Sequence, residues 1–168
     1  MSETAPNPWT QRLMLLGLLV LCLATGAVGG AITRPALDPW YRELTRPFFT
    51  PPDIAFPIVW NLLFVMMAVA AWRVWRVAGF SWDRETPHPL ALFFVQLGLN
   101  LGWSVIFFGL QSPGWALVEI VFLLGAILAT WRAFAEFDRV AGWLFVPYIA
   151  WVGYATLLNA SIVFLNRG

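Results

Sequence analysis

Amide and aromatic side chains recur on one helical face of an otherwise apolar stretch. Gln96, Asn100, Trp103 and Phe107 follow the spacing i, i+4, i+7 and i+11, which places them on the same side of a helix. Indole rings beside hydrogen-bonding amides suit a large, planar and mostly apolar ligand. The alternative is that the two amides only hydrogen-bond neighbouring helices, which is their usual role in membranes.

Two further apolar stretches carry faces of the same kind. Near the C-terminus, Tyr148, Trp151, Ala155 and Asn159 form one stripe, and the neighbouring Pro147 permits a kink. An earlier stretch has a similar series: Trp60, Asn61, Phe64 and Met67. We therefore expect three helices to turn these side chains toward a shared interior, which either binds a ligand or is an aromatic-packed core without one.

The residues that usually carry metal, redox or hydrolytic chemistry are scarce. The chain has one histidine, His88, between two prolines, and one cysteine, Cys22, inside an apolar run. We therefore predict no metal site and no histidine or cysteine ligand for a haem inside the membrane. Glu119 lies one turn inside an apolar stretch, and we interpret it as a carboxylate that snorkels to the membrane surface.

The composition is that of an integral membrane protein. Of 168 residues, 60% are hydrophobic and 11% are charged, whereas about a quarter are charged in an ordinary soluble domain. The basic residues are all arginine and the net charge is +1, which excludes a nucleic-acid-binding face. We predict an all-α membrane protein, a single bundle of five transmembrane helices (13–168) after a polar tail (1–12) with no cleaved signal. The expected spans are 13–33, 56–75, 89–110, 115–134 and 142–165.

The connections between these spans are unequal. Residues 34–55 form a proline-rich loop, whose length and stiffness indicate a lid or another functional segment. The turn at 111–114 is short, so the third and fourth spans are expected to be antiparallel neighbours. Arginines are more numerous on the N-terminal side of the spans, which favours a cytoplasmic N-terminus.

Tryptophans and glycines give further expectations about packing. Two G-x-x-x-G patterns, Gly26 with Gly30 and Gly98 with Gly102, permit close helix contact, either in a dimer seam or within one bundle. Six tryptophans near the span ends are expected at the membrane interface: Trp40, Trp75, Trp82, Trp115, Trp131 and Trp143.

Three segments of this sequence closely resemble the translocator protein family (TspO/MBR, tryptophan-rich sensory proteins). They are WYRELTRPFFTPPDIAFPIVW at residues 40–60, QLGLNLGWSVIFF at 96–108 and LFVPYIAWVGYATLLN at 144–159. The first departs from the family pattern at two positions, where Arg46 replaces a lysine and Phe49 replaces a tryptophan. Arg46 keeps the charge but changes the hydrogen-bonding geometry, and Phe49 keeps a ring without its N–H.

The resemblance implies a five-helix bundle, commonly a homodimer, with a ligand cavity that the first loop covers. Members bind porphyrins and, in animals, cholesterol and synthetic drugs. The matching wall residues here are Trp40, Pro51, Phe56, Trp60, Gln96, Asn100, Trp103, Pro147, Trp151, Ala155 and Leu158. To these we add Tyr148, which shares a face with Trp151, and a loop arginine, Arg46 or Arg42, which could pair with a ligand propionate.

These observations together predict a tetrapyrrole-binding membrane protein, a sensor or handler of porphyrins, rather than an enzyme. Its ligand would be protoporphyrin or haem, no cofactor is required, and metal-free porphyrin should bind at least as well as haem. Two alternatives stay open: a light-dependent porphyrin-degrading enzyme that uses Trp60 and Trp151, or a passive translocator of porphyrin, sterol or lipid. A prokaryotic-type member in a bacterial cell membrane, inner or outer, is expected.

Overall fold

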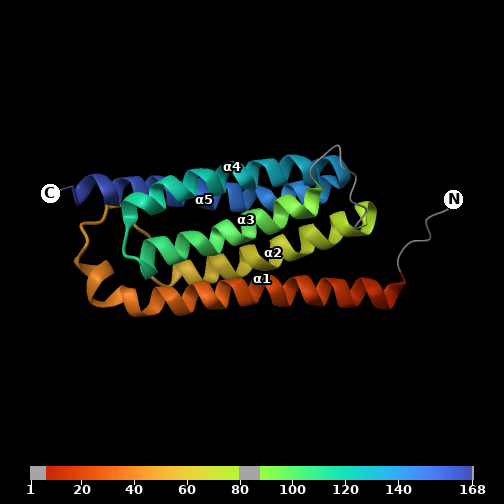
Figure 1. Ribbon diagram of the computed structural model, residues 1–168, viewed down its shortest axis with the longest axis horizontal. Coiled ribbons are helices and arrows are strands. Elements are labelled where there is room, and N and C mark those ends of the chain that lie inside the picture. Colours follow the sequence, from red (N-terminus) through yellow and green to blue (C-terminus); the bar gives the residue numbers. More distant parts are fainter. Residues whose placement is uncertain (1–6, 80–87, 168) are drawn as a thin grey trace.

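The protein is an antiparallel bundle of five long helices. The computed structural model describes residues 7–79 and 88–167, and these contain no β-strand (Figure 1). The helices are α1 (Pro8–Ala36), α2 (Ala55–Ala78), α3 (Pro89–Ser104), α4 (Pro113–Phe137) and α5 (Arg139–Leu165), with short π-helical segments η1 (Leu37–Tyr41) after α1 and η2 (Val105–Gly109) after α3. All five helical units are long and apolar enough to cross a membrane, so the predicted fold class is confirmed.

Four of the five helical units extend beyond the spans that hydrophobicity marked, the exception being the third, Pro89–Gly109. The first helix begins at Pro8 rather than near residue 13, because Asn7 caps it by accepting a hydrogen bond from the Trp9 N–H at 3.0 Å. Hydropathy detects the segment inside the bilayer, whereas caps decide where the helix begins. Residues 1–6 of the expected polar tail lie outside the described residues.

Helix α2 lies in the middle of the bundle, where α1 and α5 both pack against it (Figure 1). Its inward face carries small side chains, including Ala68, Ala70 and Ala71, which are fully buried. Trp75 on the same helix is only 6% exposed, so the expectation that it lies at the membrane interface is wrong. The central place of α2 buries even the ring near its end.

The remaining interfacial tryptophans divide into two groups. Trp115 and Trp143 are about 70% exposed, as the interface prediction requires. Trp40 is only partly exposed because its ring packs edge-on against Phe107, with ring centroids 5.9 Å apart. Trp82 lies outside the described residues, and Trp131 is half-buried.

The glycines of the two G-x-x-x-G patterns differ in how closely another helix approaches them. A Cβ on Gly26 would lie 2.6 Å from the Phe64 ring of α2, so this glycine serves packing within one chain. Gly30 and Gly98 have no described atom within 4 Å of such a Cβ, so the close helix contact expected there is not made within the chain. The homodimer stays a prediction.

An ion pair fastens the bundle at the end where α4 meets α5. Arg73 of α2 donates to Asp138 through Nε at 3.1 Å, and its terminal nitrogen lies 2.8 Å from the other carboxylate oxygen. The Asp138 carboxylate also accepts from the Ala141 N–H at 2.9 Å, which caps α5. Burial raises the pKa of Asp138, but the hydrogen bonds from Arg73 and from backbone N–H groups lower it by more. The pKa of Asp138 therefore lies below its usual value.

Candidate functional site

A hydrogen-bonded trio lies in the bundle interior between α3 and α5. The Tyr148 hydroxyl donates to Gln96 Oε1 at 2.9 Å and accepts from Asn100 Nδ2 at 2.9 Å. All three side chains are buried, and Gln96 Nε2 also lies 3.7 Å from the sulfur of Met67. Both amides therefore hydrogen-bond a neighbouring helix, the arrangement that the sequence left as an alternative, and here they position Tyr148.

A second polar link joins α3, α4 and α5, one helical turn closer to the C-terminal end of α3. Trp103 of α3 donates its indole N–H to Asn159 Oδ1 on α5 at 3.2 Å. The Asn159 amide in turn donates to the Pro113 carbonyl at the start of α4, at 2.9 Å. This chain of bonds fixes the orientation of the Trp103 ring, which packs between two buried clusters of the bundle.

Aromatic rings from α2 and α5 meet beside this polar core. The Trp60 and Trp151 ring centroids are 6.4 Å apart and the rings are nearly perpendicular, at 89°. Phe56 packs edge-on against Trp151 with ring centroids 5.8 Å apart, and the Tyr154 ring centroid lies 5.7 Å from that of Trp151. Trp60 also packs against the ring of Tyr148, which connects this group to the buried amides. We call Phe56, Trp60, Trp151 and Tyr154 the indole cluster.

One polar atom of the indole cluster is unsatisfied. The Trp151 indole nitrogen is buried, and no hydrogen-bond acceptor for it is found in residues 7–79 and 88–167. Buried N–H groups are nearly always paired, and an indole nitrogen can only donate. Trp151 therefore offers a donor to an acceptor atom that the described chain does not itself supply.

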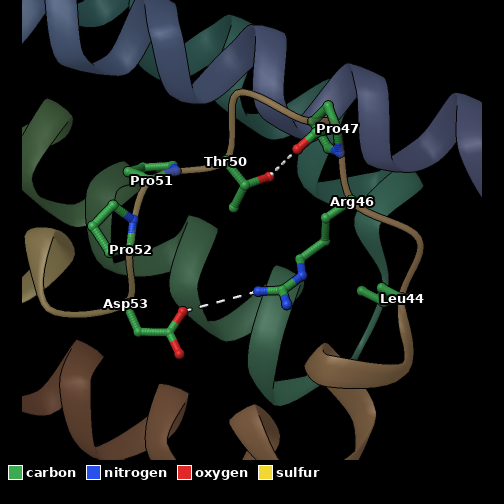
Figure 2. Close-up of a pocket in the computed structure, with 7 residues that line it drawn as sticks. All are labelled: Leu44, Arg46, Pro47, Thr50, Pro51, Pro52 and Asp53. Carbon is green, nitrogen blue, oxygen red and sulfur yellow. Dashed lines mark hydrogen bonds and ion pairs between the residues drawn. The ribbon is translucent and has the colours of Figure 1, made fainter.

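The proline-rich segment 42–54, which we call the lid, crosses the end of the bundle beside the C-terminal turns of α5 (Figure 1). A pocket of about 570 Å³ opens within it, lined by Leu44, Arg46, Pro47, Thr50, Pro51, Pro52 and Asp53 (Figure 2). This volume falls within the range of small-molecule sites, about 300 to 1,000 Å³. Thr50 donates to the Pro47 carbonyl at 2.7 Å, which holds the turn at the back of the pocket.

Arg46 is the cationic group of this pocket. Its guanidinium points across the pocket to Asp53, with a nitrogen and an oxygen 3.9 Å apart (Figure 2). It also lies over the Tyr41 ring, 5.2 Å from the ring centroid. The pair with Asp53 is long for a charge-assisted contact, so a ligand carboxylate could approach the guanidinium more closely.

The lid is attached to α5 at two points that the sequence patterns did not reveal. Asn166, at the end of α5, accepts from the Thr45 N–H and donates to the Thr45 carbonyl, both at 3.0 Å. Earlier in α5, the Tyr154 hydroxyl donates to the Phe49 carbonyl. Neither contact has a sequence signal, because each joins residues more than a hundred positions apart.

Some residues expected at the interior lie elsewhere. Asn61 is exposed and donates to the carbonyl of Pro57 on its own helix at 2.8 Å, because the residue after Trp60 is turned about 100° around the helix. Pro147 is also exposed, on the outer side of α5. Arg42 is exposed and pairs with Asp38 at 3.3 Å, so Arg46 is the loop arginine that faces the pocket.

The other expected wall residues fall into three places. Ala155 packs against the main buried cluster of the bundle, as Trp60 and Trp151 do, while Pro51 lines the lid pocket. Trp40 and Leu158 belong to a smaller cluster around Phe107 at the lid end of the bundle, which Phe56 and Trp103 also contact. Of the predicted wall, only Pro51 and Arg46 line the lid pocket, whereas Gln96 and Asn100 lie in the bundle interior, so a common ligand wall stays a prediction.

The prediction that Glu119 snorkels to the surface is wrong. Both carboxylate oxygens are buried without a hydrogen-bond partner among the described residues, and one lies near Gly102 of α3. The missing side chain of this glycine leaves room for the carboxyl between α3 and α4. Within the described part of the chain, acidic, cysteine and histidine residues also form no group of three that could hold a metal ion.

Comparison with known proteins agrees with this architecture. The sequence model of the TspO/MBR family matches residues 18–165, which include the larger part of α1 and the whole of the other four helices. The chain belongs to the TspO/MBR family. It is 42% identical to a tryptophan-rich protein TspO from Chlorobaculum tepidum over 158 residues, which is 93% of this chain and 98% of that protein. It is 36% identical to a tryptophan-rich sensory protein from Cereibacter sphaeroides, over 91% of each chain. It is also 33% identical to the translocator protein of Bos taurus, over 90% of this chain and 88% of that one.

Membership in the TspO/MBR family and the five apolar helices make this chain a multi-pass integral membrane protein. The three segments from which the resemblance was drawn contact one another in the structure, in the buried cluster around Phe107. Residues 40–60 supply the lid and the start of α2, while residues 96–108 and 144–159 supply the facing sides of α3 and α5. The three segments that resemble the family are thus far apart in the sequence but belong to one region of the fold.

Proposed function

We propose that this TspO/MBR protein binds a tetrapyrrole between the lid and the indole cluster, as a sensor or handler of porphyrins in a prokaryotic cell membrane. The observation that carries the proposal is the buried Trp151 N–H, which has no acceptor among the described residues although it lies in a group of aromatic rings beside the lid. A macrocycle with a carbonyl or carboxylate substituent would supply the missing acceptor, and its flat face would pack on the rings.

Each part of the site has a role in this arrangement. Trp60 and Trp151 provide aromatic surface, and the Gln96–Tyr148–Asn100 trio holds the wall behind them rigid. At the membrane surface, Arg46 would exchange its loose contact with Asp53 for a bidentate pair with a propionate. Binding of this kind needs no acid–base catalyst.

The location of the potential metal ligands favours metal-free porphyrin. His88 caps the N-terminus of α3, at the end of the bundle opposite the lid, where its Nδ1 accepts from the Leu90 N–H. Cys22 is buried within α1. Neither lies in the lid pocket or the indole cluster, so haem would gain no strong axial ligand from them, and protoporphyrin should bind at least as tightly.

The test is a titration of the detergent-solubilised protein with protoporphyrin, followed in the dark by tryptophan fluorescence. We compare Trp151→Phe with Trp143→Phe, a matched control on the same helix whose indole is 68% exposed. Trp151→Phe should weaken binding about five- to tenfold, the loss expected for one hydrogen bond of about 1 kcal/mol or slightly more. Trp143→Phe should leave the affinity unchanged.

Equal affinities for both variants would contradict the role of the Trp151 donor, and failure of the wild type to saturate would contradict porphyrin binding itself. Repeating the titration under light distinguishes a binding protein from an enzyme. A porphyrin absorbance that stays stable supports binding alone, whereas protein-dependent loss of that absorbance would favour porphyrin degradation.

A further inference from the structure

The arginines at the two ends of the bundle differ in how they are paired. At the lid end, Arg42 and Arg46 each form an ion pair with an aspartate. At the opposite end (Figure 1), the described residues include five arginines and two carboxylates, namely Arg12, Arg73, Arg76, Arg132, Arg139, Glu136 and Asp138. Within the described chain, Arg73 alone of these five forms an ion pair, with Asp138. This end of the bundle therefore carries an excess of unpaired positive charge.

Two of the unpaired arginines lie over indole rings. The guanidinium carbon of Arg12 is 5.4 Å from the ring centroid of Trp9, and that of Arg76 is 4.7 Å from the ring centroid of Trp72. A guanidinium over a ring uses its flat face for that contact, so the N–H donors in its plane stay available. Both arginines are exposed. Each is therefore held in place and ready to bind an anion through two parallel hydrogen bonds.

A hydrogen bond between α1 and α2 brings the two arginines to one edge of the bundle. The Trp72 indole N–H donates to the Gln11 carbonyl at 3.0 Å. Arg12 follows Gln11 directly, and Arg76 is one helical turn after Trp72. Both arginines therefore lie where α1 begins and α2 ends, and we call this region the arginine edge (Figure 1).

An apolar stripe runs along α1 from the arginine edge toward the middle of the membrane. Its residues follow the spacing i, i+4, i+7 and i+11 and are between 57% and 68% exposed: Trp9, Leu13, Leu16 and Val20. The Trp9 ring heads the stripe, where an exposed indole prefers the membrane interface. Cationic groups at the membrane surface beside an apolar stripe fit a molecule with an anionic headgroup and acyl chains better than they fit a soluble anion.

We propose that the arginine edge is a binding site for an anionic phospholipid. Arg12 and Arg76 would bind the phosphate oxygens of the headgroup, and an acyl chain would lie along Leu13 and Leu16. Phosphatidylcholine carries the same phosphate, but its choline cation is repelled by the excess of arginine at this end. The site is separate from the lid pocket and the indole cluster, so it does not depend on porphyrin binding.

The experiment is native mass spectrometry of the full chain, released from detergent that contains equal amounts of phosphatidylglycerol and phosphatidylcholine with the same acyl chains. A basic residue near an anionic headgroup contributes about 1 kcal/mol, which corresponds to about fivefold in affinity. We therefore expect one phosphatidylglycerol to bind roughly 25-fold more tightly than phosphatidylcholine. Glycerophosphoglycerol, the same headgroup without acyl chains, should not displace it at equal concentration.

Variants separate the site from general attraction to positive charge. Arg12→Gln and Arg76→Gln should each weaken phosphatidylglycerol binding about fivefold. Arg34→Gln is the matched control, because it removes the same charge from an exposed position at the other end of α1, and it should have no effect. Trp9→Leu keeps every charge but removes the ring under Arg12, and it should weaken binding about two- to fivefold.

Three results would overturn the proposal. Equal binding of the two lipids to the wild type, a comparison that does not depend on any variant folding, would show that the arginine edge does not select an anionic headgroup. Equal losses in Arg12→Gln and Arg34→Gln would mean that only the net charge matters. Displacement by glycerophosphoglycerol would assign the edge to a soluble anion instead of a lipid.

Discussion

The two-way contact between Asn166 and Thr45 should control how readily the lid opens. Replacing Asn166 with alanine removes both hydrogen bonds to the Thr45 backbone, each 3.0 Å long. A hydrogen bond of this kind contributes about 0.5 to 1.5 kcal/mol net, so the pair contributes about 1 to 3 kcal/mol. Because the site is exposed, we take the lower half of that range, which corresponds to a lid that opens roughly 5- to 30-fold more often.

Two measurements follow the lid in different ways. Hydrogen exchange of the lid amides should speed up by that factor in Asn166→Ala, most clearly at Thr45, whose N–H loses its acceptor. The protoporphyrin dissociation rate, measured by stopped flow, should rise in parallel if the ligand leaves beneath the lid. Asn166→Asp is the matched variant: it keeps the acceptor for the Thr45 N–H but loses the donor, so its effect should be about half on a free-energy scale.

The reasoning is refuted if lid exchange in Asn166→Ala equals that of the wild type, because the contact would then contribute nothing to closure. Faster exchange with an unchanged dissociation rate would mean that the lid opens as described but that ligands leave by another route. Arg167→Ala, at the exposed neighbouring position, should change neither quantity.

Three further predictions concern the framework around the site. The bonds from Arg73 and from backbone N–H groups lower the pKa of Asp138 in the folded state. The stability that they provide is therefore present above the unfolded-state pKa of about 4 and is lost as the pH falls through the lower folded-state pKa. Asp138→Asn should make the thermal unfolding midpoint, followed by circular dichroism, depend less on pH in the acid range. Gly26→Ala should destabilise the bundle by about 1 to 3 kcal/mol because its Cβ would lie 2.6 Å from a ring of α2, whereas Gly30→Ala, with open space around it, should be neutral in the same denaturation assay. Tyr148→Phe removes the hydrogen-bond partner of Gln96 Oε1 and of Asn100 Nδ2 and should lower unfolding stability by about 1 to 3 kcal/mol; an unchanged midpoint would contradict the buried network.

Family relatives carry names that differ in function: tryptophan-rich sensory protein in Cereibacter sphaeroides and translocator protein in Bos taurus. The proposed binding of a flat apolar ligand beneath the lid would be compatible with either name, because the lid contacts would then determine how long the ligand stays. Measuring lid exchange and ligand dissociation on the same variants therefore addresses the functional difference directly.

The sequence determined the membrane class and the helix number. Apolar stretches of about 20 residues can only be satisfied in a bilayer as helices, so the five spans could be read directly from composition. Helical spacing also placed Gln96 and Asn100 on one face with Trp103, and the proline-rich segment as a cover over one end.

Only the tertiary structure decided what those residues touch. Periodicity gives the direction of a side chain around its own helix but not which neighbour lies there. It therefore could not show that Tyr148 joins the two amides, or that Asn166 fastens the lid. For the same reason it assigned Trp75 to the membrane interface and Glu119 to the membrane surface, although packing against neighbouring helices buries the indole and covers the carboxyl oxygens. Contacts between residues far apart in the chain depend on how the helices are arranged, and hydrophobic spacing along each helix carries no record of that arrangement.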